Sequence, residues 1–415
     1  MDVLYPHCAG LDVHKRTVVA CIAHTDGRGH ATCTTQTFGT ATPDLLTLQA
    51  WLVTEHVTPV AMEATGSYWK PVYNLLDGVF TTWVVNPAHI KNVPGRKTDI
   101  KDAAWIADRL RHGLLRPSFI PDRPQRELRE LTRQRTPWLA ERSRDVNRIQ
   151  KVLEGANIKL SSVVTDVLGV SGRRMLDALV AGTTDPATLA GLADPRLRAT
   201  PAMLKAALTG GMGPHQRFLL GRLLQHGDEL TAHLTALDAE ITRRVDPQAA
   251  TIARLDTIPG IDRRTAEAIV AELGTDVSRF PSADHLAAWA GLAPGQHESA
   301  GKRRHAATRK GNPARRDALV RAAWAASHTK TTFLGALYRR WVKRMPAKKA
   351  IVALAHRILV IVYHVLATGD PYQELGVAYH EARDRSPIVQ RTIQRLTRLG
   401  YRVTVEPAAP AADTA

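Results

Sequence analysis

The fold is decided by residues 8–38, which read CAGLDVHKRTVVACIAHTDGRGHATCTTQTF. Three β-rich runs, AGLDV, TVVACIAH and ATCTTQTF, are separated in this stretch by the polar segments HKR and TDGRGH. Short runs of this composition, bounded by turn-forming residues, predict strands. We therefore expect the chain to open with three antiparallel strands.

Helices and strands alternate after this opening. The patterns predict a helix over 43–56, a strand over 57–63, a helix over about 67–76, a strand over 79–86 and a helix over about 98–112. The resulting order, βββαβαβα, predicts a mixed sheet whose later strands are parallel and joined by crossover helices. Functional groups are expected at the carboxyl ends of those strands.

The rest of the chain is predicted to be helical. Residues 123–154 form a long basic connector, and apolar residues recur at coiled-coil spacing at Leu220, Leu223, Leu230, Leu234, Leu237 and Ile241. A core helix of a bundle gives the same stripe, so both readings stay open. Residues 255–274, LDTIPGIDRRTAEAIVAELG, predict a helix-hairpin-helix whose turn could face a phosphate, or an ordinary αα corner.

These patterns predict an α/β domain followed by all-α regions. The expected boundaries are 1–122 for the sheet domain, 123–250 for the linker helix and coiled coil, 251–385 for a helical domain and 386–415 for a C-terminal tail. The apolar segment from Ala350 to Leu366 is interrupted by histidines and arginine, so we read it as a buried helix.

Composition indicates a polyanionic partner. The 415 residues carry 56 Lys or Arg against 39 Asp or Glu, a formal charge of +17, and 44% hydrophobic residues, which excludes a disordered chain. Nucleic acid is the expected partner because guanidinium groups fork onto phosphate oxygens. Cys8, Cys21 and Cys33 have no CxxC spacing, which favours a reducing cytoplasm over a disulfide framework or a zinc site.

Four acids form a candidate metal site. Asp12 and Glu63 each close an apolar predicted strand, and Asp99 and Asp102 lie three apart on a predicted helix. Oxygen ligands of this kind suit Mg²⁺ and phosphoryl transfer. Each acid alone could instead be a turn residue or a first-turn helix acid. Asp108 lies six residues beyond Asp102 and is expected at the surface.

A serine and several basic residues form a second candidate site. Ser299 lies in the loop QHESAGK, where neighbouring cations could stabilise an attacking alkoxide, although a serine in such a loop is usually a turn residue. No acid occurs between Lys302 and Arg316. The expected phosphate-binding residues are Arg96, Lys97, Lys302, Arg303, Arg304, Arg309, Lys310, Arg315 and Arg316.

Several motifs in order resemble one family. GLDVHK, AMEATGSYW and NPAHIKNVPGRKTDIKDAAWIADRLRHGLL, followed by IPGIDRRTAEAIVAELG, FPSADHLAAWAGLAPGQHESAGKRR and RKGNPARR, are similar to motifs of the DEDD transposases of bacterial insertion sequences, the IS110 family. The resemblance spans about residues 7–365. In the family pattern two adjacent serines commonly precede glycine. Here the first of these positions is Glu298, which leaves Ser299 as the candidate.

The resemblance implies a fold and a mechanism. It implies a RuvC-like, ribonuclease-H-type domain whose four acids bind Mg²⁺, and a helical domain whose serine becomes covalently joined to DNA. It also implies a structured guide RNA that pairs with donor and target DNA, a homodimer or higher oligomer joined through the coiled coil, and a cytoplasmic, nucleoid-associated location. A covalent intermediate conserves the phosphodiester energy, which agrees with a sequence that has no GxxxxGK[ST] motif.

Two other classes of protein remain open. A metal-dependent nuclease similar to a Holliday-junction resolvase would need the acids alone, with water as the attacking group. A non-catalytic nucleic-acid-binding protein would use the same acids structurally. Substitution of Ser299 separates the first class from a recombinase, and substitution of Asp12 separates the second.

Overall fold

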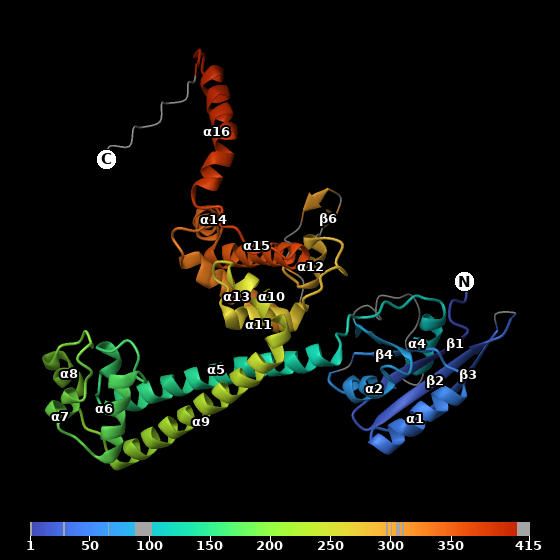
Figure 1. Cartoon of the computed structure of the whole chain (residues 1–415), viewed down its shortest axis with the longest axis horizontal. Helices are drawn as coiled ribbons and strands as arrows, with labels where there is room; N and C mark the ends of the chain where they lie inside the picture. The colour runs from blue at the N-terminus through green and yellow to red at the C-terminus, as the bar shows by residue number, and fades with distance from the viewer. Residues whose placement is uncertain are drawn as a thin grey trace. The chain divides into compact units, whose positions relative to one another are not determined.

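The computed structural model consists of two compact units. It describes residues 2–27, 30–64, 66–87, 102–295, 298–299, 301–303, 308 and 311–404. The first unit, Met1–Pro121, is called the sheet unit here, and the second, Asp122–Ala415, the helical unit (Figure 1). The division falls one residue before the boundary expected after residue 122.

A five-stranded mixed sheet organises the sheet unit. Its strands, in the order in which they pair, are β3 Ala31–Gly39, β2 Thr17–Thr25, β1 His7–Val13, β4 Pro59–Glu63 and β5 Thr81–Val85. The pairs β1–β2 and β2–β3 are antiparallel, whereas β1–β4 and β4–β5 are parallel. The prediction of a meander followed by parallel crossover strands is confirmed.

Helices cover both faces of this sheet. On one face, α1 Thr42–Thr54 and α2 Trp69–Leu76 pack with side chains such as Leu11 and Met62. On the other face, α4 Asp102–Arg111 packs with Cys8 and Ala61. Gly10 permits this second contact, because a Cβ on it would lie 2.2 Å from the carbonyl oxygen of Ala103. The glycine therefore sets how closely α4 approaches the sheet.

A long helical hairpin, called the stalk here, begins the helical unit. It consists of α5 Arg123–Gly155 and α9 Pro214–Val245, which run antiparallel (Figure 1). Of the predicted stripe on α9, Leu220, Leu230, Leu234, Leu237 and Ile241 are buried, and Leu223 is half-buried beside the buried Leu224. The coiled-coil spacing is thus satisfied within one chain, by α5. This packing agrees with the alternative reading of the stripe as a bundle helix, since its apolar side chains are covered within the chain.

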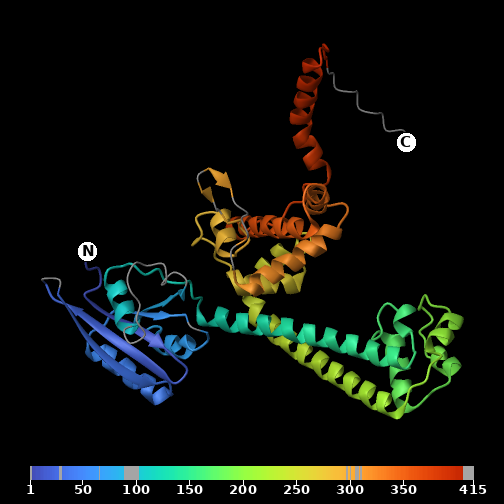
Figure 2. The same cartoon turned by 180° about the vertical axis from the view of Figure 1, so that it is seen from behind.

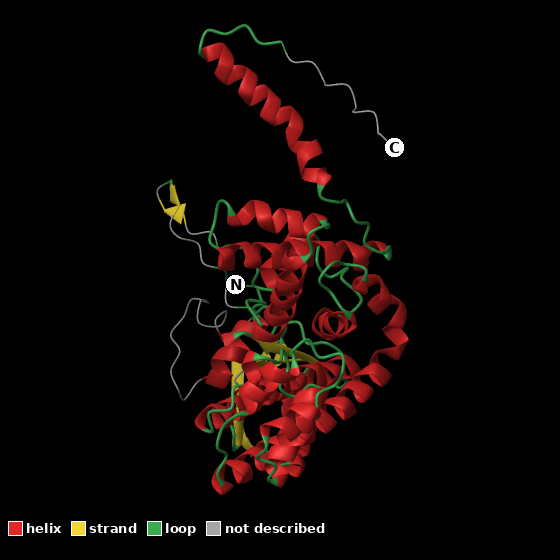
Figure 3. Cartoon of the chain, turned by 90° about the vertical axis from the view of Figure 1, so that its left-hand side faces the viewer, coloured by secondary structure: helices red, strands yellow, loops and turns green. Residues whose placement is uncertain are grey.

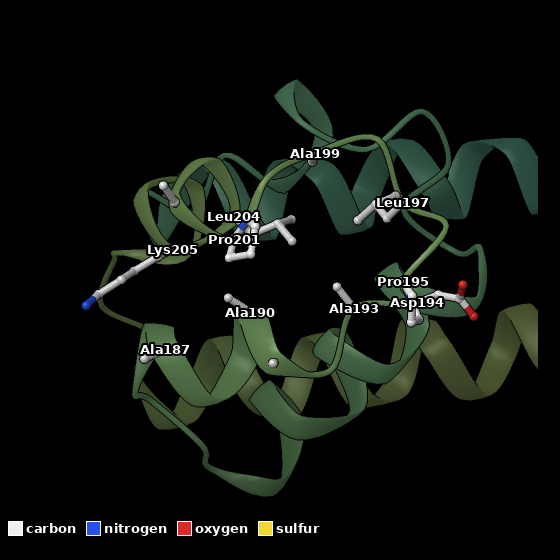
Figure 4. Close-up of a pocket in the computed structure, with 12 residues that line it drawn as sticks. Ala187, Ala190, Ala193, Asp194, Pro195, Leu197, Ala199, Pro201, Leu204 and Lys205 are labelled. Carbon is white, nitrogen blue, oxygen red and sulfur yellow. The ribbon is translucent and has the colours of Figure 1, made fainter.

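Short helices close the far end of the stalk. They are η2 Leu160–Ser162, α6 Val170–Ala181, α7 Pro186–Gly191 and α8 Pro201–Leu208. An apolar hollow of about 520 Å³ lies between α7 and α8. Figure 4 shows Ala190 and Leu204 at its border and Lys205 pointing outward at its rim. No predicted site residue lines this hollow.

A bundle of six helices follows the stalk. After η3 Asp246–Gln248 come α10 Ala249–Asp256, α11 Arg263–Leu273, α12 Ala283–Trp289, α13 Pro313–His328, α14 Phe333–Val342 and α15 Ala347–Thr368. Among the described residues, α15 is the helix that is long and apolar enough to span a membrane. Its Leu354, Ile358 and Val362 are fully buried in the bundle core. The reading as a buried helix agrees with this packing.

The turn between α10 and α11 serves packing. A Cβ on Gly260, where φ is +89°, would lie 2.3 Å from the carbonyl oxygen of Ala322 on α13. Ile258 and Ile261 on either side of it are buried. The buried turn is compatible with the αα corner and with the helix-hairpin-helix alike, and its glycine is required by the close approach of α13.

Helix α16, Ala378–Arg398, corrects the expected C-terminal tail, because the boundary at 386 falls inside this helix. Val389, Ile393 and Leu396 are half-buried at helical spacing, a pattern that marks an amphipathic helix. At its start, the ring of Tyr379 packs edge-on against Phe333, with ring centroids 5.4 Å apart. Figure 2 shows α16 following α14 and α15.

Candidate functional site

Asp12 and Glu63 lie at neighbouring positions on two parallel strands. Leu11 of β1 is in register with Met62 of β4, so the next residue on each strand is one of the two acids. Side chains alternate along a strand, which puts Asp12 on the same face as Gly10 and Glu63 on the same face as Ala61. That is the face covered by α4.

Helix α4 brings Asp102 to the same edge of the sheet. The amide of Leu4, ahead of β1, donates to the carbonyl of Arg111 at the end of α4 (2.8 Å), and Ala103 lies over Gly10. The helix therefore runs antiparallel to β1 and begins where β1 ends. Three acids that lie far apart in sequence thus share one edge.

The side chains at this edge are carboxylates that suit a hard cation. Carboxylate oxygens are the ligands that Mg²⁺ takes in proteins, and the three acids supply them from two strand ends and a helix start. Among the described residues, no three His, Cys, Asp or Glu side chains are grouped closely enough to hold a metal ion. The fourth predicted acid, Asp99, lies outside the described residues, as do Arg96 and Lys97.

His14 is a neighbour that the sequence analysis did not single out. Its Nε2 lies 3.1 Å from Oδ2 of Asp12, whose side chain is 17% exposed. The signal was present in GLDVHK, since residues two apart in extended backbone point to the same face. His14 is therefore placed to share a proton with Asp12 or to orient its carboxylate.

Asp108 takes the surface role expected of it. Its Oδ1 accepts a hydrogen bond from Nε of Arg111 at 2.9 Å, and Arg109 and His112 lie within 4 Å. The side chain is 38% exposed. It stabilises the last turn of α4 and does not belong to the acid edge.

Ser299 lies on a small β-hairpin, called the serine hairpin here. Its strands are β6 Glu298–Ser299 and β7 Lys302–Arg303, with Ser299 in register with Lys302 (Figure 3). Gly301 has φ of +70°, as a two-residue hairpin turn requires. On either side of the serine hairpin in the chain, Pro294 and Thr308 form an isolated backbone bridge. Arg304, Arg309 and Lys310 lie outside the described residues.

Arg315 corrects one predicted phosphate contact. Its side chain is only 12% exposed, its Nε lies 3.3 Å from Oε2 of Glu272, and its Cζ lies 3.5 Å from the ring centroid of Trp289. Burial lowers the pKa of Arg315 to about 10, so it stays charged at neutral pH. Its guanidinium is used inside the bundle and does not face a surface phosphate. Arg316 is half-exposed in the same turn of α13 and stays a predicted contact.

Two regions of the chain match known protein families. Residues 9–158 match the profile of the DEDD transposases of the IS110 type, and residues 252–339 match that of the transposase IS116/IS110/IS902 family. The first match contains the acid edge and the whole of α5. The second contains the serine hairpin and the helices around it.

Individual relatives agree with these profiles. A probable family 20 transposase of Pseudomonas aeruginosa is 27% identical over 76% of this chain and 85% of its own length. The transposase for insertion sequence element IS1111A of Coxiella burnetii is 25% identical over 76% of this chain and 79% of its own. A pilin gene-inverting protein of Moraxella bovis is 32% identical over 34% of this chain and 45% of its own. The chain belongs to the IS110 family of insertion-sequence transposases, enzymes that act on DNA.

Proposed function

We propose that this transposase exchanges DNA strands by joining Ser299 covalently to DNA, with Mg²⁺ held by Asp12, Glu63, Asp99 and Asp102. The observation that carries the metal half is the shared edge of Asp12, Glu63 and Asp102, formed by strand register and by the direction of α4. Mg²⁺ bound there would neutralise charge on the scissile phosphate and orient it.

In the part of the reaction that uses Ser299, a DNA phosphoryl group passes from a sugar oxygen to the serine. The Oγ of Ser299 attacks phosphorus, the bond from phosphorus to a sugar oxygen breaks, that oxygen gains a proton, and the serine proton passes to a base or to solvent. Attack by another sugar hydroxyl on the phosphoserine reverses the step and rejoins DNA without a nucleotide cofactor. Lys302, the cross-strand neighbour of Ser299 in the hairpin, supports the proposal as a cation close in the chain fold.

A relative's name supports recombination in particular. The protein of Moraxella bovis is named for inverting a pilin gene, and inversion requires that strands be rejoined as well as cut. The partners proposed with it are donor and target DNA and a structured guide RNA, bound mainly through phosphates. The residues proposed to make these contacts are Arg96, Lys97, Lys302, Arg303, Arg304, Arg309, Lys310 and Arg316.

We also propose that the enzyme works as a homodimer or higher oligomer in the nucleoid. Because the stalk stripe is covered by α5, the contact between copies has to use other residues. Phe218 and Leu219 on α9 are 64% and 48% exposed and supply apolar surface beside the covered stripe. Chemical crosslinking of the full chain with and without F218D tests this surface.

The decisive experiment traps the protein–DNA adduct. Wild-type protein with Mg²⁺, guide RNA and donor DNA should give a denaturation-resistant adduct whose DNA-linked peptide contains Ser299, and S299A should lose it while still binding DNA and RNA. Ser327 is the matched control, since its buried hydroxyl donates to the carbonyl of Trp324 at 2.7 Å and S327A should keep the adduct.

Other outcomes separate the competing classes. Normal cleavage by S299A without any adduct would mean a nuclease that uses water, and a D12N protein with full activity would mean that the acids are structural. Replacing the guide RNA loops should redirect the target, and an unchanged target would contradict RNA guidance.

A further inference from the structure

We propose that Trp289 and Arg315 clamp the two ends of the segment that carries Ser299, and that Glu272 and Arg133 hold this clamp to the stalk. The inference rests on the proposed nucleophile. Trp289 and Arg315 are positioning residues in it, since neither is proposed to touch DNA.

The clamp lies where the segment leaves and re-enters the bundle. Helix α12 ends at Trp289 and α13 begins at Pro313, and the serine hairpin lies between these helices. The guanidinium carbon of Arg315, in the first turn of α13, lies 3.5 Å from the ring centroid of Trp289. A cation stacked on an aromatic ring at this distance joins the two helix ends directly.

The backbones beside the clamp are also in contact. A Cβ on Gly311 would lie 2.4 Å from the carbonyl oxygen of Ala290, the residue after Trp289. Farther along the segment, Pro294 forms a backbone bridge with Thr308. These contacts narrow the base of the segment at three successive levels. The hairpin at its tip, by contrast, is held by two strands of two residues each.

Glu272 fixes the far side of Arg315. This carboxylate on α11 is 3% exposed, and it accepts two hydrogen bonds from Arg133 of the stalk, at 2.6 Å from Nε and 3.0 Å from Nη2. Its Oε2 also lies 3.3 Å from Nε of Arg315. One buried carboxylate thus connects stalk helix α5 to the turn that follows the serine hairpin.

The excess positive charge around Glu272 favours a positioning role for Arg315 over a stabilising one. Arg129 lies beside the same carboxylate and donates from Nε to the carbonyl of Ala271 at 2.9 Å. Glu272 therefore faces three guanidiniums with one negative charge. Arg133 satisfies the carboxylate without Arg315, so the buried positive charge of Arg315 exceeds what the acid needs. A side chain kept at this cost is expected to serve a geometric requirement.

A neighbouring cluster supplies the matched control. Glu267, also on α11 and 1% exposed, receives Arg264 at 2.7 Å and Arg263 at 3.1 Å. It too is a buried acid with more than one arginine, but both of these ion pairs lie within α11. Arg263→Met therefore removes a guanidinium from a buried glutamate without touching the serine segment.

The experiment compares R315M with R263M in the full chain. Methionine keeps an apolar contact with Trp289 but loses the planar cation. R315M should form the Ser299 adduct about 10- to 100-fold more slowly than R263M at saturating DNA, because small misplacement of a reacting group costs rate. Its DNA affinity and melting temperature should match those of R263M. R315K, which keeps the charge but not the planar fork, should not restore the rate.

A second readout keeps the clamp testable without the reaction. Trypsin should cut after Lys302 or Arg303 faster in native R315M than in native R263M, since the hairpin loses its fixed base. W289L should have the same two effects, and adding it to R315M should slow the adduct no further. Equal adduct rates and equal cleavage in R315M and R263M would overturn the clamp. A wild type that forms its adduct elsewhere than at Ser299 would instead overturn the proposed nucleophile.

Discussion

The buried acids of the helical unit and the strand-end acids of the sheet unit are placed in different ways. Buried acids of the helical unit each meet a basic partner: Asp145 meets Arg148 and His226, Glu267 meets Arg264, and Glu272 meets Arg133. In the sheet unit, Asp12, Glu63 and Asp102 share one edge through strand register and helix direction. Acids beside cations stabilise a fold, whereas acids placed together favour binding a cation from solution.

The largest expected effect separates chemistry from stability at the acid edge. E63Q should lower strand exchange by roughly three orders of magnitude, since charge stabilisation by a bound metal is worth several kcal/mol. The free energy of unfolding should not fall. Strand-exchange assays with urea titrations check both, and E55Q in the same unit, whose carboxylate pairs with His24 at 3.1 Å, should stay active. A fully active E63Q would place this acid with those that only stabilise.

The next prediction concerns stability, because the buried acid Glu272 of the helical unit is expected to affect unfolding. E272L should lower the free energy of unfolding by about 3–5 kcal/mol, because Arg129, Arg133 and Arg315 would lose their buried counter-charge. Urea denaturation followed by circular dichroism measures the change. A loss below about 1 kcal/mol would mean that water reaches this cluster, contradicting the 3% exposure of Glu272.

A smaller effect is expected inside the stalk. Asp145 is 1% exposed, with Arg148 at 2.7 Å and Nδ1 of His226 at 2.6 Å. D145N keeps the shape but removes the charge, and should cost roughly 1–3 kcal/mol in the same denaturation assay. The control is D228N, whose pair with Arg173 is exposed and should cost less than about 1 kcal/mol. Equal costs would show that burial does not decide the value of these acids.

The smallest effect concerns a helix cap. Although desolvation by burial raises the pKa of Asp262, its hydrogen bonds with Thr265 and with its own backbone, together with the charge of Arg135, leave the pKa below its usual value. The carboxylate caps α11, so D262A should cost about 1 kcal/mol near neutral pH. Because the folded-state pKa is depressed, this contribution is present above about pH 4 and is lost as the pH falls further. Thermal melts from pH 7 to pH 3 should show the wild-type advantage shrinking, and a constant advantage would assign it to something other than the charge.

Much of the sheet unit could be predicted because its signals are local. Alternating apolar runs fix the strands, and the βαβ connections fix which strands are parallel, so the shared edge of Asp12 and Glu63 follows from sequence order. The place of Asp102 needed one further fact. Gly10 lets α4 lie against β1, and that close approach depends on a tertiary contact that the sequence pattern does not reveal.

Two points in the helical unit could not be predicted, for the same physical reason. A heptad stripe indicates that a helix face is covered, but not whether the covering helix belongs to the same chain. Leu230 and Leu234 therefore fit both a coiled coil between copies and a bundle helix within one chain. Likewise, Arg315 stands in an acid-free basic run, and its acid, Glu272, lies 43 positions earlier in the chain. A partner so distant in sequence is found only by folding.

The ion pair between Glu127 and Arg244 joins the two stalk helices at their base, so the length of the stalk can change without separating them there. These residues lie near the start of α5 and the end of α9, 117 positions apart, yet Nη1 of Arg244 is 2.7 Å from Oε2 of Glu127. The start of α5 and the end of α9 therefore lie together, at what is called the root of the stalk here. Deleting or adding seven residues in both helices would shift the tip by about 10 Å while preserving the apolar register and leaving that root in place. The length of the stalk can therefore vary in heptad steps while the proposed acid edge and the proposed serine segment keep their own surroundings.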